Sequence, residues 1–337
     1  MTQYFRPLLQ SGPARPVDAA VLAAGWTWFS HVEVLERGGA PQVISLGEVP
    51  QAALDPLLAA RAPIRGMSFE VPRIMGILNA TPDSFSDGGV HATAEAALAG
   101  AAQMTGADIL DVGGESTRPG APFVPVEVEI ARTLPVITAL RAAGHHQILS
   151  IDTRKSEVAQ AALEAGADLV NDVSGFTFDA GLAPLCAQKD VPVCVMHAQG
   201  DPATMQNAPH YDDVLLDVYD FLAERVATLT SMGVAKHNIV VDPGIGFGKT
   251  LEHNLMLLAR LSLFHGLGVA VLLGASRKRF IGTIGGGADP TDRMPGSLAV
   301  ALAALKQGTQ IVRVHDVPET AQAIALWRAV MAGESNG

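Results

Sequence analysis

The chain has 337 residues, 48% of them hydrophobic and 17% charged, a composition that excludes intrinsic disorder and supplies enough apolar surface for a large core. Its net charge of −11 argues against binding to nucleic acid through bulk charge. Two cysteines, Cys186 and Cys194, are too few for a disulfide framework. The N-terminus lacks a signal-peptide pattern and no apolar run approaches about 18 residues, so we expect a cytoplasmic protein without a membrane span.

Residues 1–70 differ in character from the rest of the chain. They hold two of the three tryptophans, Trp26 and Trp28, and two short runs typical of strands, HVEVLE and PQVISL, between stretches rich in Pro and Gly. We expect a small N-terminal extension, to which the sequence assigns no role, followed by one large domain over residues 71–337.

From about residue 72 onward, short apolar runs rich in β-branched residues alternate with longer Ala/Leu/Glu-rich runs, which is the pattern of βαβ units. The expected strands begin at Ile74, Ile109, Ile148, Leu169, Val191, Ile239, Val269 and Gln310. Eight such units favour a closed (β/α)8 barrel. A doubly wound open sheet is the alternative, but it usually has about five or six strands and a Gly-rich turn after the first, whereas here that strand ends in Asn79.

Each of the eight apolar runs ends in polar residues that a core strand does not need. They are Asn79, Asp111, Glu115, Thr117, Asp152, Asn171, Asp172, His197, Asp242, Ser276, Lys278, Arg313 and His315. Because the carboxyl ends of all strands in a parallel barrel open on one face, these residues predict a single active-site mouth. For Asp172, Ser174 and Thr153, capping of the following helix is the alternative reading. His197 could equally contact a ligand or be satisfied within the protein.

Arg313 and His315 lie two residues apart and therefore share the inward face of the last strand, whereas Val312 and Val314 share its outward face. A guanidinium in the mouth needs either an anionic ligand or a carboxylate partner, and both readings stay open. Cationic and histidine side chains gather in the strand-end loops of this acidic chain, which favours an anionic small molecule such as a phosphate or diphosphate. They are Arg118, Lys249, Arg277, Lys278, Arg279, Arg313 and His315.

Several segments resemble the signatures of one family. MGILNATPDSFSDGG, over residues 75–89, and GADILDVGGESTRPGA, over residues 106–121, are similar to the first two signatures of the dihydropteroate synthases. The later segments SIDTRKSEVAQAALEAGADLVNDVSG, VMHAQG, VDPGIGFGKT, GASRKRFIG and RVHD resemble the remaining signatures, in order. The resemblance covers nearly all of the expected barrel, from Ile74 to the C-terminus, and implies the same (β/α)8 fold.

The resemblance implies an enzyme that joins p-aminobenzoate to 7,8-dihydropterin-6-ylmethyl diphosphate and forms 7,8-dihydropteroate and diphosphate for folate synthesis. In the implied mechanism diphosphate leaves first, and the arylamine then attacks the pterin methylene cation, so no covalent enzyme intermediate is needed. The family also implies Mg²⁺, bound by the diphosphate and Asn79, small-molecule substrates and a homodimer.

The family motifs assign residues to each part of the mouth. The resemblance implies pterin contacts for Asp152, Asn171, Met196, Asp242, Phe247 and Lys278, and diphosphate contacts for Asn79, Arg313 and His315. It implies p-aminobenzoate contacts for Asp83, Phe85, Thr117, Arg118 and Pro119. The catalytic residues so implied are Asp152, Lys278, Arg313 and His315.

Arg279 departs from the family pattern, and two other functions compete. Many members have serine after the lysine of SRK, proposed to meet the p-aminobenzoate carboxylate, whereas this chain has Arg279.

Barrels that transfer a methyl group from methyltetrahydrofolate to a corrinoid protein share the pterin pocket but do not need SRK, RVHD or the TPDSFSDGG loop. A non-catalytic pterin-binding paralogue should have lost loop residues first, yet Asp83, Thr117 and Arg118 are intact.

Overall fold

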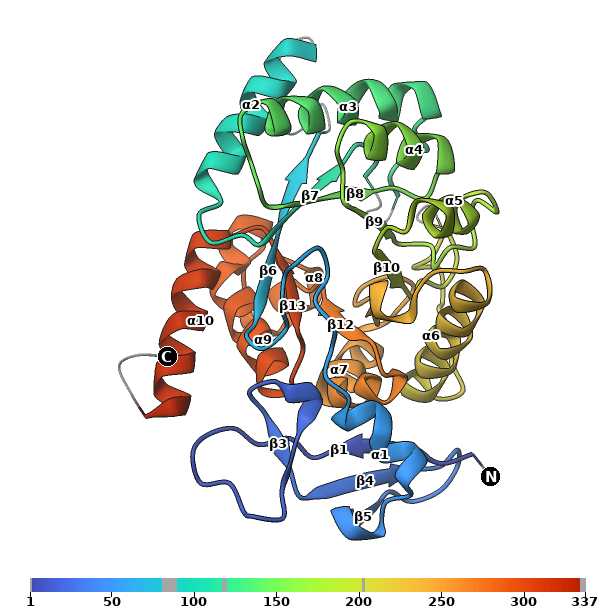
Figure 1. Ribbon diagram of the computed structural model, residues 1–337, viewed down its shortest axis with the longest axis vertical. Coiled ribbons are helices and arrows are strands. Elements are labelled where there is room, and N and C mark those ends of the chain that lie inside the picture. The colour runs from blue at the N-terminus through green and yellow to red at the C-terminus, as the bar shows by residue number, and fades with distance from the viewer. Residues whose placement is uncertain (1, 81–89, 117–119, 202–203, 334–337) are drawn as a thin grey trace.

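The computed structural model describes residues 2–80, 90–116, 120–201 and 204–333. Eight parallel strands of these residues close into a barrel, in the order β6-β7-β8-β9-β10-β11-β12-β13 and back to β6 (Figure 1). They are β6 (Arg73–Asn79), β7 (Ile109–Gly113), β8 (Ile148–Asp152), β9 (Leu169–Asp172), β10 (Val193–Met196), β11 (Ile239–Asp242), β12 (Ala270–Leu273) and β13 (Ile311–Val314). Every expected strand is present, and the (β/α)8 fold is confirmed.

A helix on the outside of the barrel follows each strand, and all but the last connect successive strands. They are α2 (Val90–Gln103), α3 (Val126–Ala142), α4 (Ser156–Glu164), α5 (Leu182–Lys189), α6 (Val214–Ser231), α7 (Leu251–Ala259), α9 (Met294–Lys306) and α10 (Val317–Ala332). A short additional helix, α8 (Arg279–Gly285), and a 3-10 turn (Pro290–Arg293) lie between β12 and α9. None of the helices in the described ranges combines the length and apolarity that crossing a bilayer requires.

Alternation along the strands divides the core into two layers. Val312 and Val314 face the layer between strands and helices, as their spacing predicts. Ile311 instead joins the cluster inside the barrel, which also contains Ile64 and Phe69. These two residues fall within the expected extension, yet both are buried among residues from the beginnings of the barrel strands. They therefore plug the amino-terminal end of the barrel.

The N-terminal extension forms a small layer of its own at one end of the molecule (Figure 1). Its main sheet has three antiparallel strands in the order β1 (Tyr4–Pro7), β4 (His31–Leu35) and β5 (Gln42–Ser45), next to a two-stranded sheet of β2 (Ala20–Val21) and β3 (Trp28–Phe29) and the helix α1 (Gln51–Leu58). The Tyr4 hydroxyl donates to Asp220 of α6, and the Trp26 indole donates to the Leu305 carbonyl at 2.8 Å. The extension is thus docked on the barrel by polar contacts and by Tyr4 and Leu35, which join the barrel's apolar layer, while its other apolar residues form a separate cluster.

Candidate active site

A cavity of about 350 Å³ opens at the carboxyl ends of the strands. Its lining consists of Ile77, Asn79, Glu115, Ser116, Asp152, Gly246, Phe247, Gly274, Ser276, Arg277, Lys278, Pro290, Arg293, Arg313 and His315. Six of the residues to which the family resemblance assigns substrate contacts therefore meet there: Asn79, Asp152, Phe247, Lys278, Arg313 and His315. They come from loops and strand ends far apart in the sequence, as one mouth requires.

Three further expected site residues, Asn171, Met196 and Asp242, are buried at neighbouring strand ends rather than in the lining. Met196 and Asp242 are register partners on β10 and β11. A Cβ at Gly274, which lines the cavity, would lie 3.4 Å from the Asp242 Oδ2, so this carboxylate lies directly behind the cavity wall. The residues expected to bind p-aminobenzoate, Asp83, Phe85, Thr117, Arg118 and Pro119, lie outside the described residues.

Arg313 forms a paired contact with two buried carboxylates. Its Nε donates to the Asp111 Oδ2 at 2.6 Å, and its Nη2 donates to the Asp152 Oδ2 at 2.8 Å. Asp111 also accepts from the Asn171 Nδ2 at 3.1 Å. Burial raises the pKa of Asp152 to about 8, an effect that Arg313 opposes and Asp111 reinforces. The carboxylate partner considered for Arg313 is therefore present, and the guanidinium keeps other donors for a ligand.

Lys278 and His315 are also held from within the protein. The Lys278 ammonium donates to the Ile245 carbonyl and lies 4.4 Å from the centre of the Phe247 ring. Burial lowers the pKa of Lys278 to about 8, although Asp242 opposes this shift. The His315 Nδ1 lies 3.0 Å from the Ser276 Oγ. Both side chains are thus positioned before any substrate arrives.

The segment 243–249 is closed by Lys249, which does not line the cavity. Its buried ammonium donates to the carbonyls of Gly244 and Phe247, at 2.9 and 3.0 Å, and contacts the His197 Nδ1 at 2.8 Å. A Cβ at Gly244, where φ is +68°, would lie 1.8 Å from the His197 carbonyl oxygen, so only glycine fits this turn. The His197 Nδ1 therefore has its partner within the protein, and Lys249 supports the turn that carries Phe247.

The expected cationic cluster is consequently smaller than the sequence indicates. The Lys249 ammonium donates to backbone carbonyls of its own turn, and Arg277 forms an ion pair with Asp316. Arg279 is exposed and does not line the cavity. Arg118 lies outside the described residues. Sequence reasoning also missed Arg293, which lines the cavity from the turn before α9. That turn does not follow a strand, so a search of strand ends could not find it.

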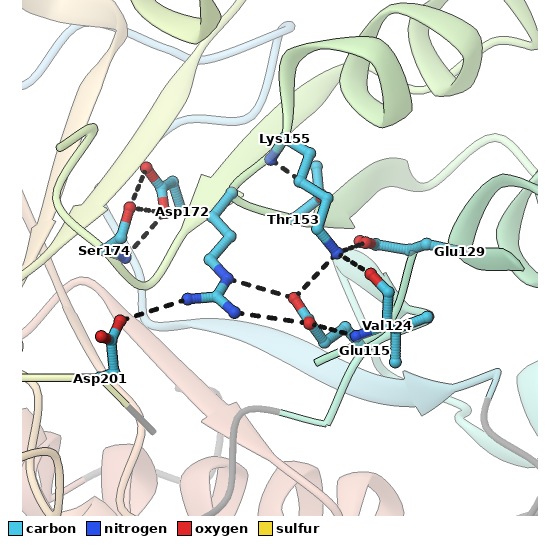
Figure 2. A network of polar contacts seen from close by, with 9 residues as sticks. Glu115, Val124, Glu129, Thr153, Lys155, Asp172, Ser174 and Asp201 are labelled. Carbon is cyan, nitrogen blue, oxygen red and sulfur yellow. Dashed lines mark hydrogen bonds and ion pairs between the residues drawn. The ribbon is translucent and has the colours of Figure 1, made fainter. Parts of the chain in front are cut away.

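A buried network of charges lies beside the cavity (Figure 2). Glu115, which lines the cavity, accepts from the Val124 amide at 2.9 Å, the Arg154 Nε at 3.2 Å and the Lys155 Nζ at 3.1 Å. Lys155 also donates to Glu129 of α3 and to the Val124 carbonyl. Burial raises the pKa of Glu129, whereas Lys155 lowers it. The network joins the segment after β7 to α3 and to the segment after β8. In the sequence, the two adjacent cations of the motif DTRKSE are the feature that indicates such a network.

Comparison with known proteins assigns this constellation to a family. A family model described as pterin binding enzyme matches residues 75–315. The dihydropteroate synthase of Escherichia coli strain K12 is 46% identical over 267 residues, which cover 79% of this chain and 94% of the relative. This chain belongs to the dihydropteroate synthase family. The Synechocystis dihydropteroate synthase is 47% identical over 261 residues, 76% of this chain and 90% of the relative.

Solved structures of the dihydropteroate synthase family have the same fold. The Yersinia pestis enzyme, determined with a sulfonamide drug, superimposes with a TM-score of 0.74 at 43% identity and covers 80% of this chain and 98% of its own. The Xanthomonas albilineans enzyme, determined with 4-aminobenzoic acid, gives a TM-score of 0.75 at 47% identity, with 80% and 97% covered. Family membership therefore rests on sequence and structure together.

Proposed function

We propose that this chain joins p-aminobenzoate to 7,8-dihydropterin-6-ylmethyl diphosphate and releases 7,8-dihydropteroate and diphosphate. The observation that carries the proposal is the meeting of Asn79, Lys278, Arg313 and His315 in one cavity, with the Asp242 carboxylate directly behind its wall. Relatives of known structure support the substrate class, since the Xanthomonas albilineans enzyme was solved with 4-aminobenzoic acid and with 7,8-dihydropteroate.

The pterin ring fits the buried side of the cavity. Its aminopyrimidinone edge presents adjacent N–H donors, for which the Asp242 carboxylate is a matching acceptor. Lys278 would donate to the ring carbonyl, while Asp152 and Asn171 would hold the opposite edge. Phe247 lines the cavity and Met196 lies beside Asp242, so both would offer apolar contacts to the ring. The buried carboxylates would favour the cationic pterin that forms when diphosphate leaves.

The diphosphate would lie against Asn79, Arg313 and His315. Arg313 uses two of its five N–H donors on Asp111 and Asp152, so three remain for phosphate oxygens. Ser276 fixes the orientation of the His315 ring through Nδ1. These groups would oppose the charge that develops on the leaving diphosphate. The assignments of Asp83, Phe85, Thr117, Arg118 and Pro119 to p-aminobenzoate stay predictions.

The donor set fits Mg²⁺ carried by the substrate. No group of three or more His, Cys, Asp or Glu side chains among the described residues could hold a metal ion. The protein would supply the amide oxygen of Asn79, a hard ligand, and diphosphate oxygens and water would supply the others, as is usual for Mg²⁺. When bound, the ion would neutralise charge on the leaving diphosphate.

The first test is the reaction itself in the presence and absence of metal. Purified protein incubated with the pterin diphosphate, p-aminobenzoate and Mg²⁺ is expected to form dihydropteroate, measured by chromatography. Excess chelator should abolish product formation, because uncompensated diphosphate is a poor leaving group. Excess Mg²⁺ added back is the control and should restore it. Undiminished turnover in chelator would contradict the metal assignment.

We expect kcat/KM for the pterin diphosphate to fall as the pH rises above about 8. Burial lowers the Lys278 pKa to about 8, so a rise in pH through this value removes the proton that Lys278 donates to the ring. Replacement by arginine, which stays protonated, should move this limb to higher pH even if it lowers the rate. A profile for the Lys278→Arg variant with the same alkaline limb as the unmodified protein would exclude Lys278 as its origin.

Assembly and location stay proposals. Leu326 and Val330 lie four residues apart on α10 and are 66% and 62% exposed, an apolar stripe that supports a homodimer. Cys186 and Cys194 are free and buried, as suits a reducing cytoplasm.

A further inference from the structure

Four cationic side chains line the cavity within the described ranges: Arg277, Lys278, Arg293 and Arg313. Carboxylates compensate three of them. Arg313 pairs with Asp111 and Asp152, and Arg277 pairs with Asp316. Lys278 lies close enough to the buried Asp242 for this carboxylate to raise its pKa. Arg293 is the exception.

Arg293 donates to three backbone carbonyls. Its Nε bonds the Gly287 oxygen at 3.0 Å, its Nη1 the Arg277 oxygen at 3.1 Å, and its Nη2 the Ala288 oxygen at 2.7 Å. Since a guanidinium has five N–H donors, two remain. Carbonyl oxygens satisfy hydrogen bonds but carry no net charge, so these contacts leave the positive charge uncompensated.

No carboxylate of the described residues forms an ion pair with Arg293. Asp289 is near enough to feel its charge, but this side chain is exposed and accepts from the Thr291 amide at 2.8 Å and the Thr291 hydroxyl at 2.7 Å. Arg293 is thus a half-buried guanidinium on the cavity wall, with two N–H donors that bond no described residue and no described carboxylate in contact, which is the arrangement an anionic ligand would complete.

The guanidinium is also fixed in place. A Cβ at Gly282 of α8 would lie 2.7 Å from the Arg293 Nε, so the glycine lets α8 pack directly on the side chain. The three carbonyl bonds tie the guanidinium to residues on both sides of α8. Little side-chain entropy is therefore lost when a ligand binds.

We infer that Arg293 binds an anionic oxygen of a substrate at the α8 side of the cavity. The inference rests on the proposed function, which brings two anionic groups to this cavity: the carboxylate of p-aminobenzoate and the diphosphate of the pterin ester. Both are oxyanions that a guanidinium can hold, and kinetics with each substrate distinguishes them.

The test compares Arg293→Met and Arg293→Lys with the unmodified protein. We measure KM for p-aminobenzoate, KM for the pterin diphosphate, and the inhibition constant of p-aminobenzamide, which lacks the carboxylate charge. If the carboxylate is the partner, Arg293→Met raises KM for p-aminobenzoate by at least about tenfold and leaves the inhibition constant of the amide within about twofold. If the diphosphate is the partner, KM for the ester rises instead. Arg293→Lys should retain part of the affinity in either case.

The matched control is Arg141→Met, which removes the ion pair with Asp168 between α3 and the start of β9, away from the cavity. It should leave both KM values unchanged. Equal weakening of the acid and the amide, or two unchanged KM values in Arg293→Met, would overturn the inference. If the methionine variant does not fold, Arg293→Lys decides, because unchanged constants in that variant overturn the inference too. Failure of the unmodified protein to form dihydropteroate would instead contradict the proposed function.

Discussion

Replacing Arg313 with alanine is expected to lower the free energy of unfolding by about 3–5 kcal/mol, because the change leaves buried carboxylates without their cation. Asp111 is fully buried and Asp152 is 7% exposed, so both carboxylates depend on protein partners for most of their stabilisation. The two carboxylates share Arg313, and without it the charge of Asp111 would raise the pKa of Asp152 unopposed by the guanidinium. The loss should therefore be smaller at low pH, where the carboxylates can be protonated, and grow as the pH rises.

Denaturant titration of Arg313→Ala and of the double variant Arg313→Ala/Asp111→Asn measures this effect. The second change removes one of the unpaired charges, so the double variant should be more stable than the single one. Glu224→Ala is the control, since the Glu224 side chain is 70% exposed and its pair with Arg225 should contribute less than about 1 kcal/mol. A loss for Arg313→Ala as small as that of the control would show that Asp111 and Asp152 do not depend on the guanidinium.

The Arg313→Ala variant also tests ligand binding, which is measured separately from its effect on stability. Calorimetric titration with the pterin diphosphate and with the bare pterin should show a larger loss for the diphosphate, which we assign to Arg313 directly. The bare pterin should also lose affinity, because Arg313 holds the Asp152 carboxylate proposed to contact the ring. Asp242→Ala should weaken both ligands alike. This ion pair links the two halves of the site in a way that strand-end spacing could not reveal.

The fold was predictable because its determinants are local and periodic. β-branched runs separated by helical stretches place the strands, and alternation along β13 correctly directs Val312 and Val314 outward. The same alternation directs Arg313 into the cavity, where the structure places it. The residues that meet there follow from a property of every parallel barrel, the common direction of its strand ends.

Charge compensation was less predictable, since it depends on which side chains meet across the fold. Lys249 points to carbonyls of its own turn and Arg277 turns to Asp316, although both follow strands in the sequence. Arg293 reaches the cavity from the segment between α8 and α9, where the strand-end rule does not apply. Backbone carbonyls, which hold Arg293 and Lys249, have no signature in the side-chain pattern.

The last prediction concerns the boundary between extension and barrel. A chain that begins at Pro72 is expected to unfold, whereas one that begins at Ala60 should fold and keep its activity per folded molecule. The residues that differ, 60–71, include Ile64 and Phe69, which are 0% and 4% exposed inside the barrel. Loss of each such side chain costs about 2–5 kcal/mol, and their sum approaches the whole stability of a typical domain.

The extension before Ala60 should be less critical, because it holds a separate apolar cluster and every residue that lines the cavity comes after it. Its removal exposes the surface that Tyr4 and Leu35 cover, so we expect a lower melting temperature without loss of the site. Thermal melting and dihydropteroate formation by both truncations test this, and the full chain with Ile64→Ala and Phe69→Ala is the matched control for the plug. Equal melting temperatures for the two truncations would show that the barrel closes without these side chains. An inactive but folded chain from Ala60 would instead mean that the extension shapes the cavity from the opposite end of the barrel.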